Sequence, residues 1–213
     1  MVKHPQINEY LDIAILLFLE KIRKTKGARF NAHRRLLAKH RSSQFALAIL
    51  TIYVIAASVL ALTLIDSNKE NLIPTVNAAT IVASVFILVQ GILETAKHYH
   101  LRAFQMLQCG ERISAIYDEL FNKRIVGDIS VSEFLKYVKK YDRIITDFSE
   151  NHAEIDYLLF IYMHQHPHSE KYSSLGNWWK IQRLVFINQL NIWGTSIFYI
   201  VVPPFSIIYS IYF

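Results

Sequence analysis

The polar residues of this chain that could carry chemistry lie inside long uncharged stretches. Asn77, Thr80, Ser84 and Gly91 follow one another at steps of three, four and seven residues, which places them on one face of an α-helix. Polar groups are costly in hydrocarbon and usually face a protein neighbour or water. Such a face can pack against another helix through small residues and hydroxyls, or it can line an aqueous pore. The residues alone leave both interpretations open.

Further polar residues extend these two interpretations. Glu94 extends this polar face to the cytoplasmic end of the helix, and Gln90 and Glu94 share the adjacent face. Thr51 and Ser58 lie one heptad apart in an earlier uncharged stretch. Because two or three helices in one chain cannot enclose an aqueous channel, a pore would require a homo-oligomer. These residues are therefore candidates for pore lining or for helix packing.

Motifs of enzymes and metal sites are absent from the sequence. The chain has no glycine-rich phosphate loop and no HExxH, GxSxG or CxxC motif, and it has only six glycines. His164, His166 and His168 alternate around Pro167, but no cysteine or carboxylate stands at ligand spacing, so a solvated loop is favoured over a transition-metal site. We predict no catalytic residue, no metal and no cofactor, and we do not expect an enzyme.

The uncharged stretches have the length of membrane-spanning helices. They run from Phe45 to Ile65 and from Ile73 to Leu93, and each is close to the ~20 residues that cross a hydrocarbon core of ~30 Å. Only residues 66–72 join them, and 53% of all residues are hydrophobic, a high share for a soluble domain. The sequence predicts a two-helix transmembrane hairpin over residues 42–93.

A basic run before the first span sets the expected orientation. No acidic residue occurs between Glu20 and Asp66, and positive charge beside a span marks its cytoplasmic side. We therefore expect a multi-pass protein with a cytoplasmic N-terminus. Attraction to the lipid bilayer explains the run more simply than nucleic-acid binding, because Phe30 is its one interleaved aromatic residue. The run includes Lys24, Lys26, Arg29, Arg34, Arg35, Lys39 and Arg41.

Long amphipathic helices are expected after the hairpin. Residues 94–183 carry apolar residues at steps of three and four, the helical period. The second span should continue as a helix as far as a turn over residues 122–130, with Gly127 and Asp128 at its centre, and a second helix should run from Val131 to His164. Ser130, with Glu133 three residues later, forms a capping box at its start. The single cysteine, which allows no intramolecular disulfide, suits a reducing compartment.

The two ends of the chain complete the predicted organisation. The apolar run Ile13–Leu19 is too short to span and predicts a packed or interfacial helix within residues 1–41. Residues 172–179 should form a loop. Residues 184–213 become apolar again, with no charge from Leu190 on, and they predict a third span or a re-entrant segment, although Pro203–Pro204 would kink or break a helix. The predicted fold class is an all-α, oligomeric membrane protein.

Two stretches of the sequence resemble the SLATT domain, a family of two-transmembrane effectors of prokaryotic conflict systems. The resemblance covers about residues 21–120. In the first stretch it rests on Lys24, Arg29, Phe30, Asn31, Ala32, Arg34, Arg35 and Leu36, followed by Ser42 or Ser43. In the second it rests on Glu94, Tyr99, Arg102, Ala103, Cys109, Ile113 and Leu120. The apolar C-terminus resembles the subgroup associated with reverse transcriptases.

The resemblance implies a pore-forming or membrane-perturbing effector of anti-phage defence, located in the bacterial inner membrane and acting in abortive infection. A sensor partner, either a reverse transcriptase or a nucleotide-signalling enzyme, would supply the trigger. Two other classes stay open. One is a constitutive small channel or transporter subunit, and the other is a membrane anchor that recruits a nucleic-acid-bound partner through residues 21–41.

Overall fold

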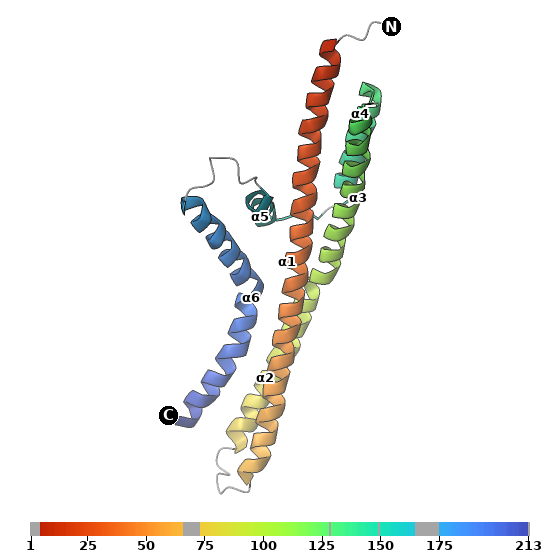
Figure 1. Ribbon diagram of the computed structural model, residues 1–213. Coiled ribbons are helices and arrows are strands. Elements are labelled where there is room, and N and C mark those ends of the chain that lie inside the picture. The colour runs from red at the N-terminus through yellow and green to blue at the C-terminus, as the bar shows by residue number, and fades with distance from the viewer. Residues whose placement is uncertain (1–4, 66–72, 128, 149, 165–174, 213) are drawn as a thin grey trace. The chain divides into compact units, whose positions relative to one another are not determined.

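In the computed structural model, every regular element of the described residues is an α-helix (Figure 1), which confirms the all-α prediction. The structure describes residues 5–65, 73–127, 129–148, 150–164 and 175–212. The helices are α1 (Pro5–Ile65), α2 (Ile73–Ala96), α3 (Tyr99–Val126), α4 (Val131–Asp147), α5 (Glu154–His164) and α6 (Leu175–Tyr212). The chain divides into a core unit, Met1–Leu36 with Leu101–Phe186, and a hairpin unit, Leu37–His100 with Ile187–Phe213.

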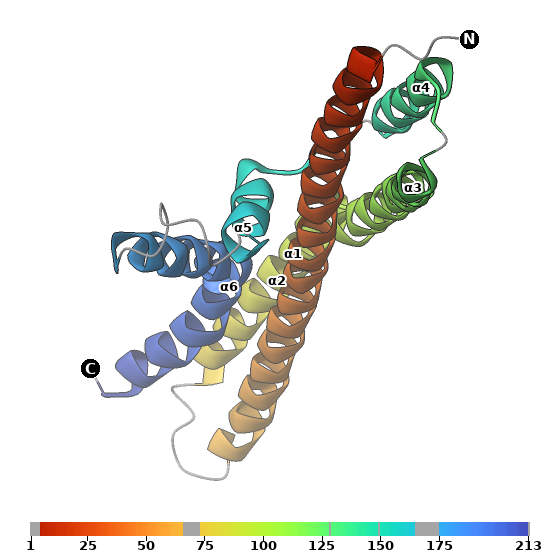
Figure 2. The ribbon, with the colours of Figure 1, turned by 45° about the horizontal axis from the view of Figure 1, so that its top comes forward.

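The hairpin unit contains the two predicted spans. Two helical stretches are long and apolar enough to cross a membrane, and they lie within Glu9–Leu62 and Ile73–Val126. Here α1 and α2 run antiparallel and side by side (Figures 1 and 2). None of the described residues of α2 is buried, and the Val82 side chain is 70% exposed. Apolar surface exposed to this extent suits contact with lipid or with another copy rather than with water.

The third helix of the hairpin unit comes from α6. It begins at Leu175, so the loop predicted over residues 172–179 is wrong from Leu175 onward; Ser174, directly before this start, is of a type favoured before a helix. The helix continues through Pro203–Pro204. Its described residues add no further stretch that meets the length and hydropathy needed to cross a membrane. A third span over residues 184–213 therefore remains a prediction.

The core unit is held together by one apolar cluster from three helices. Phe18 of α1 stands edge-on to Phe134 and Tyr141 of α4, with ring centroids 5.6 and 5.5 Å apart. Burial of each large apolar side chain contributes about 1.5–3 kcal/mol. The short N-terminal apolar run is thus a packed helix face, continuous with the rest of α1. The cluster comprises Ile15, Phe18, Leu19, Ile22, Cys109, Ile113, Ile116, Leu120, Tyr137, Tyr141 and Ile144.

The single helix predicted over Val131–His164 is two helices, α4 and α5. Its start is as predicted, because the backbone N–H of Glu133 donates to Ser130 Oγ at 3.2 Å. However, α4 ends at Asp147, and the next residue has an extended backbone. The Asp156 carboxylate then accepts a hydrogen bond from the N–H of Ala153 at 3.0 Å, which satisfies a free donor at the start of α5. Tertiary contacts of this carboxylate decide the break.

The continuous helix predicted from the second span into α3 is interrupted at Lys97–His98. The N–H of His98 donates to the carbonyl of Thr95 at 3.1 Å, the short-range pattern of a tightened last turn. His98 has a φ of 48°, a left-handed conformation that costs a non-glycine residue about 1–2 kcal/mol. Tyr99 begins α3 directly afterwards. Neither glycine nor proline marks this position, so the sequence pattern did not reveal the break.

Candidate functional site

The polar face of α2 is exposed at two of its four predicted positions. Asn77 and Ser84 are exposed, while Thr80 and Gly91 are half-buried. The Thr80 hydroxyl donates to the carbonyl of Val76 and the Ser84 hydroxyl to the carbonyl of Thr80, both at 2.8 Å. Because each hydroxyl hydrogen is satisfied within its own helix, neither hydroxyl donates a hydrogen bond to a neighbouring helix.

Thr51 and Ser58 in the first span follow the same pattern. Their hydroxyls donate to the carbonyls of Leu47 and Val54, each at 2.9 Å, and both residues are exposed. A hydroxyl bonded to its own backbone is tolerated in lipid, and its oxygen can still accept a hydrogen bond from water. The geometry is therefore compatible with either environment for these side chains.

Gln90 has a partner on α6. The Tyr199 hydroxyl donates to Gln90 Oε1 at 3.0 Å, and the ring of Phe86 stands edge-on to Tyr199 with centroids 5.9 Å apart. These contacts join α2 to α6 within one chain. Gln90 thus takes part in helix packing, in contrast to the exposed Asn77 and Ser84.

Hydrogen bonds also join α1 to α6. The Ser42 hydroxyl donates to Ser196 Oγ at 2.5 Å, and both residues are buried. Lys39 Nζ donates to Asn191 Oδ1 at 2.8 Å. Between helices in hydrocarbon, close packing and such hydrogen bonds replace the hydrophobic driving force. The sequence offered one indication of this contact. Among the residues with polar groups in the uncharged segment of α6 are three that stand five and three positions apart: Asn191, Ser196 and Tyr199.

Tyr53 supplies a hydrogen bond that α6 cannot make for itself. In an unbroken α-helix the N–H of residue 204 would donate to the carbonyl of residue 200, but Pro204 has no N–H. The Tyr53 hydroxyl instead donates to the carbonyl of Ile200 at 3.2 Å. This matters in hydrocarbon, where an unpaired carbonyl costs several kcal/mol. We call the contacts of Lys39, Ser42, Tyr53 and Gln90 with α6 the polar seam.

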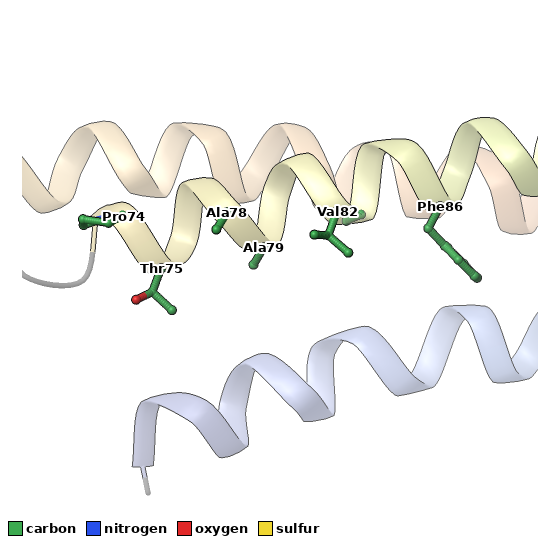
Figure 3. Close-up of a pocket in the computed structure, with 7 residues that line it drawn as sticks. Pro74, Thr75, Ala78, Ala79, Val82 and Phe86 are labelled. Carbon is green, nitrogen blue, oxygen red and sulfur yellow. The ribbon is translucent and has the colours of Figure 1, made fainter.

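An apolar groove of about 810 Å³ runs along α2. Figure 3 shows the side chains of Thr75, Ala79, Val82 and Phe86 on the side of α2 that faces α6. No residue of the predicted polar face lines this groove. The polar face and the groove therefore occupy different sides of α2. The lining residues are Pro74, Thr75, Ala78, Ala79, Val82, Ala83 and Phe86.

The Glu94 carboxylate is paired at the end of the second span. Lys97 Nζ donates to it within one helical turn, and the Glu94 side chain is only 8% exposed. This hydrogen bond raises the pKa of Lys97, so the lysine stays charged beside the carboxylate. While the pair is intact, Glu94 offers little uncompensated negative charge to a cation.

The basic residues before the first span divide into two groups. Arg34 and Arg41 are exposed and can face lipid headgroups. The other predicted members contact groups of the protein: Lys24, Lys26, Arg29, Arg35 and Lys39. Attraction to the bilayer therefore rests on fewer charges than the sequence suggested.

A buried ion pair fastens α5 to α1. Arg35 Nε and Nη2 donate to the two carboxylate oxygens of Asp156, each at 2.8 Å, and Asp156 is fully buried. One turn earlier, Asn31 Nδ2 donates to the carbonyl of Asp156 at 3.1 Å. One turn before that, a Cβ on Gly27 would lie 2.0 Å from the ring of Phe160. Gly27, Asn31 and Arg35 thus form one face of α1, the α5 junction, whose four-residue spacing was visible in the sequence.

Two more arginines hold the segment between α4 and α5. Arg29 donates to the backbone carbonyl of Glu150 and to Met106 Sδ, and Arg102 Nε donates to Glu150 Oε1 at 2.9 Å. Among the described residues, Arg29 Nε and His152 Nδ1 are buried without a hydrogen-bond partner. Burial, reinforced by the positive charge of Arg29, lowers the pKa of His152. His152 is therefore neutral at pH 7.

The structure brings together no set of metal ligands in the part of the chain that it describes. Cys109 is fully buried, and burial raises the pKa of its thiol, which disfavours the reactive thiolate. Most of the alternating-histidine segment, residues 165–168, lies outside the described residues. The expectations of no catalysis and no metal therefore remain predictions.

Comparison with known protein families gives a match over most of the chain. The family model described as SMODS and SLOG-associating 2TM effector domain family 5 matches residues 18–209. This range includes the basic run, both predicted spans and most of α6. No curated protein and no solved structure matches the chain.

Proposed function

Because the chain belongs to the SMODS and SLOG-associating 2TM effector domain family 5, and is therefore a membrane effector domain of conflict systems, we propose that it assembles into a homo-oligomer that permeabilises the bacterial inner membrane when a partner triggers it. Loss of the membrane barrier would stop the infected cell before phage is released. A reverse transcriptase or a nucleotide-signalling enzyme is the partner class expected from the sequence.

The observation that carries this proposal is the exposure of Asn77 and Ser84 on a span that has no buried residue among those described. Ser84 and Thr80 bond to their own backbone, so their hydroxyls tolerate lipid. The same oxygens can accept hydrogen bonds from water once several copies of α2 surround a lumen. A surface of this kind can change from a lipid-facing to a water-facing state without unpairing a buried group.

The polar seam is the element that a trigger would have to release or shift. Its hydrogen bonds fix α1 and α2 against α6, yet Ser43 Oγ and Asn188 Oδ1 are buried beside it with no hydrogen-bond partner among the described residues. A partly satisfied polar contact is less stable than a fully satisfied one. We propose that the seam holds the resting arrangement and that the partner alters the packing of the core unit, which rotates the spans.

The Glu94–Lys97 pair would then decide the charge at one end of the pore. If rotation separates Lys97 from the carboxylate, the freed Glu94 forms part of an acidic ring, which favours cations. If the pair persists, the ring is neutral and the pore discriminates weakly by charge.

Membrane leakage in cells tests the proposal. The full chain is expressed with and without its partner genes in bacterial cells that contain a membrane-potential dye, and Ser84→Leu and Glu94→Ala are compared with the unaltered protein. We expect Ser84→Leu to abolish depolarisation because leucine removes the wettable oxygen and fills the lumen. Val85→Leu, which adds bulk at an exposed apolar position next to Ser84, is the matched control and should remain active.

Unchanged depolarisation and toxicity in both Ser84→Leu and Glu94→Ala would sink the pore proposal. Depolarisation that is the same with and without partner genes would instead indicate a constitutive channel. Growth arrest without depolarisation would favour a membrane anchor for another toxic component.

A further inference from the structure

The outer face of α3 carries acidic residues that have no ion-pair partner among the described residues. Glu111 and Asp118 are both exposed and lie seven residues apart, two helical turns or about 10.5 Å along the axis. Phe104 and Ile125 continue the same heptad series and are 49% and 69% exposed. This face points away from the apolar cluster, since the buried residues of α3, such as Ile113 and Ile116, occupy the opposite side of the helix.

The outer face of α4 carries the opposite charge. Lys136, Lys139 and Arg143 follow one another at steps of three and four, and all are exposed. The core-facing side of this helix is marked by the buried Tyr137 and Tyr141. The one acidic residue near this face is Asp147, the last residue of α4. The core unit therefore presents an acidic helix face and a basic helix face on two adjacent helices.

Ion pairs within the chain fix the register of these two helices. Lys140 Nζ lies 3.1 Å from the Glu119 carboxylate, and Lys123 pairs with Glu133. In an antiparallel pair, two residues stay level when one residue number rises as the other falls. By this rule Asp118 and Lys139 fall between the registers set by the Glu119–Lys140 and Lys123–Glu133 pairs, so they stand at nearly the same level. Arg143 lies one turn, about 6 Å, from Lys139 on the side towards Glu111.

We propose that the acidic face of α3 in one copy docks against the basic face of α4 in a second copy of this chain. A closed ring relates its copies by rotation about one axis. In the proposed ring this axis runs parallel to α3 and α4, so every residue of these two helices keeps its own level from copy to copy. Between neighbouring copies Asp118 then meets Lys139, and Arg143 reaches between Asp118 and Glu111.

A second copy fits these faces better than an unrelated partner. The contact uses different faces of the two copies, so one copy keeps its basic face free and the other its acidic face, and the contact can repeat until a ring closes. A nucleic acid would bind Lys136, Lys139 and Arg143 but would be repelled by the acidic face beside them. At the far end of the contact, Ile125 stands at about the level of Leu135, which is 51% exposed, and this adds apolar area.

Cysteine cross-linking between two differently altered chains tests the contact. Asp118→Cys and Lys139→Cys are made in separate full-length chains, and membranes that contain one or both are treated with an oxidant. Cross-linked dimer should form in the mixture and be at least tenfold weaker with either variant alone. Cys109 does not interfere because it is fully buried. No cross-link in the mixture, or equal cross-linking in the single-variant membranes, overturns the proposal.

Charge reversal supplies a second measurement, the mass of the detergent-solubilised complex. Asp118→Lys and Lys139→Glu should each reduce assembly, and the chain that carries both should recover it, because the pair is rebuilt with inverted signs. Asp142→Lys, an exposed position of α4 outside the basic face, is the control and should assemble normally. Loss of co-purified RNA in Lys139→Glu, with assembly unchanged, would overturn the contact in favour of nucleic acid.

This contact rests on the proposed oligomer, yet the two can fail separately. A specific cross-link without membrane depolarisation supports the contact and refutes the pore. Conversely, Asp118→Lys and Lys139→Glu could both leave assembly unchanged while depolarisation persists. That result refutes the contact and leaves the pore proposal intact.

Discussion

Removal of either member of the Arg35–Asp156 pair should destabilise the core unit strongly. Asp156 is fully buried, and the Arg35 side chain is 12% exposed, so Arg35→Met leaves a carboxylate in the interior without its countercharge. Breaking a buried pair in this way costs about 3–5 kcal/mol, and the slight exposure of Arg35 favours the lower end. Asp156→Asn leaves the guanidinium unpaired in the same place and should cost a similar amount.

The two substitutions together should cost much less than their sum. In the double variant no unpaired charge remains, and the amide oxygen of an asparagine at position 156 can still accept the hydrogen bond from Ala153. At about 2–4 °C of melting temperature per kcal/mol for a chain of this size, each single substitution should lower the transition by about 6–12 °C. The double variant should recover at least half of that loss.

Thermal unfolding followed by circular dichroism at 222 nm, at one scan rate in one detergent, measures these shifts. Arg34→Met is the matched control, because Arg34 is the exposed neighbour of Arg35, and it should shift the transition by less than about 2 °C. If Arg35→Met behaves like Arg34→Met, or if the double variant loses the full sum, the buried pair does not hold α5 to α1 as the structure indicates.

Substitutions at three further positions test other contacts. Tyr53→Phe removes the donor to the Ile200 carbonyl and should destabilise the packing of α6 by about 1–3 kcal/mol. We expect faster proteolysis of α6 in detergent than in the unaltered protein. An equal rate of proteolysis would count against the polar seam. His98→Gly relieves the left-handed conformation and should raise the melting temperature by about 2–4 °C, whereas His98→Val should lower it; the reverse order would contradict the left-handed backbone at this position. The pKa of His152 is lowered by burial and by Arg29, so the unfolded chain takes up the proton first as pH falls. Stability is then lost as pH drops through ~6.5, the ordinary histidine pKa, and His152→Gln should flatten this loss between pH 7.5 and 5.5; an unchanged profile would exclude His152 as its source.

The α5 junction changes the interpretation of the basic run. The sequence assigned Arg29 and Arg35 to topology and lipid attraction, but both hold the segment that precedes or begins α5. Asn31 lies one turn before Arg35 and bonds the same helix. Residues that carry the family resemblance therefore coincide with a structural junction of the core unit.

The sequence by itself determined the elements whose cause is local. Two uncharged stretches of ~20 residues are long enough to cross a bilayer wherever the rest of the chain lies. Helical spacing also found buried positions of α3 and α4 such as Ile113 and Tyr141, although Phe104 and Leu135 at the same spacing are exposed. The capping residue Ser130 also acts over three residues only, so its role was legible. The polar face of α2 was found for the same reason, although its two interpretations remained.

Tertiary structure alone decided which polar residues meet across long separations in the chain. Arg35 and Asp156 are 121 residues apart, Ser42 and Ser196 are 154 apart, and no periodicity links such pairs. The breaks after Asp147 and at His98 have the same origin, because contacts from other helices, or strain that the packing tolerates, override a continuous helical pattern. The sequence thus specified the membrane hairpin. The packing of α6 determined which hydroxyls of the hairpin are bonded across helices, and the packing of α5 determined which arginines of the core unit are buried in ion pairs.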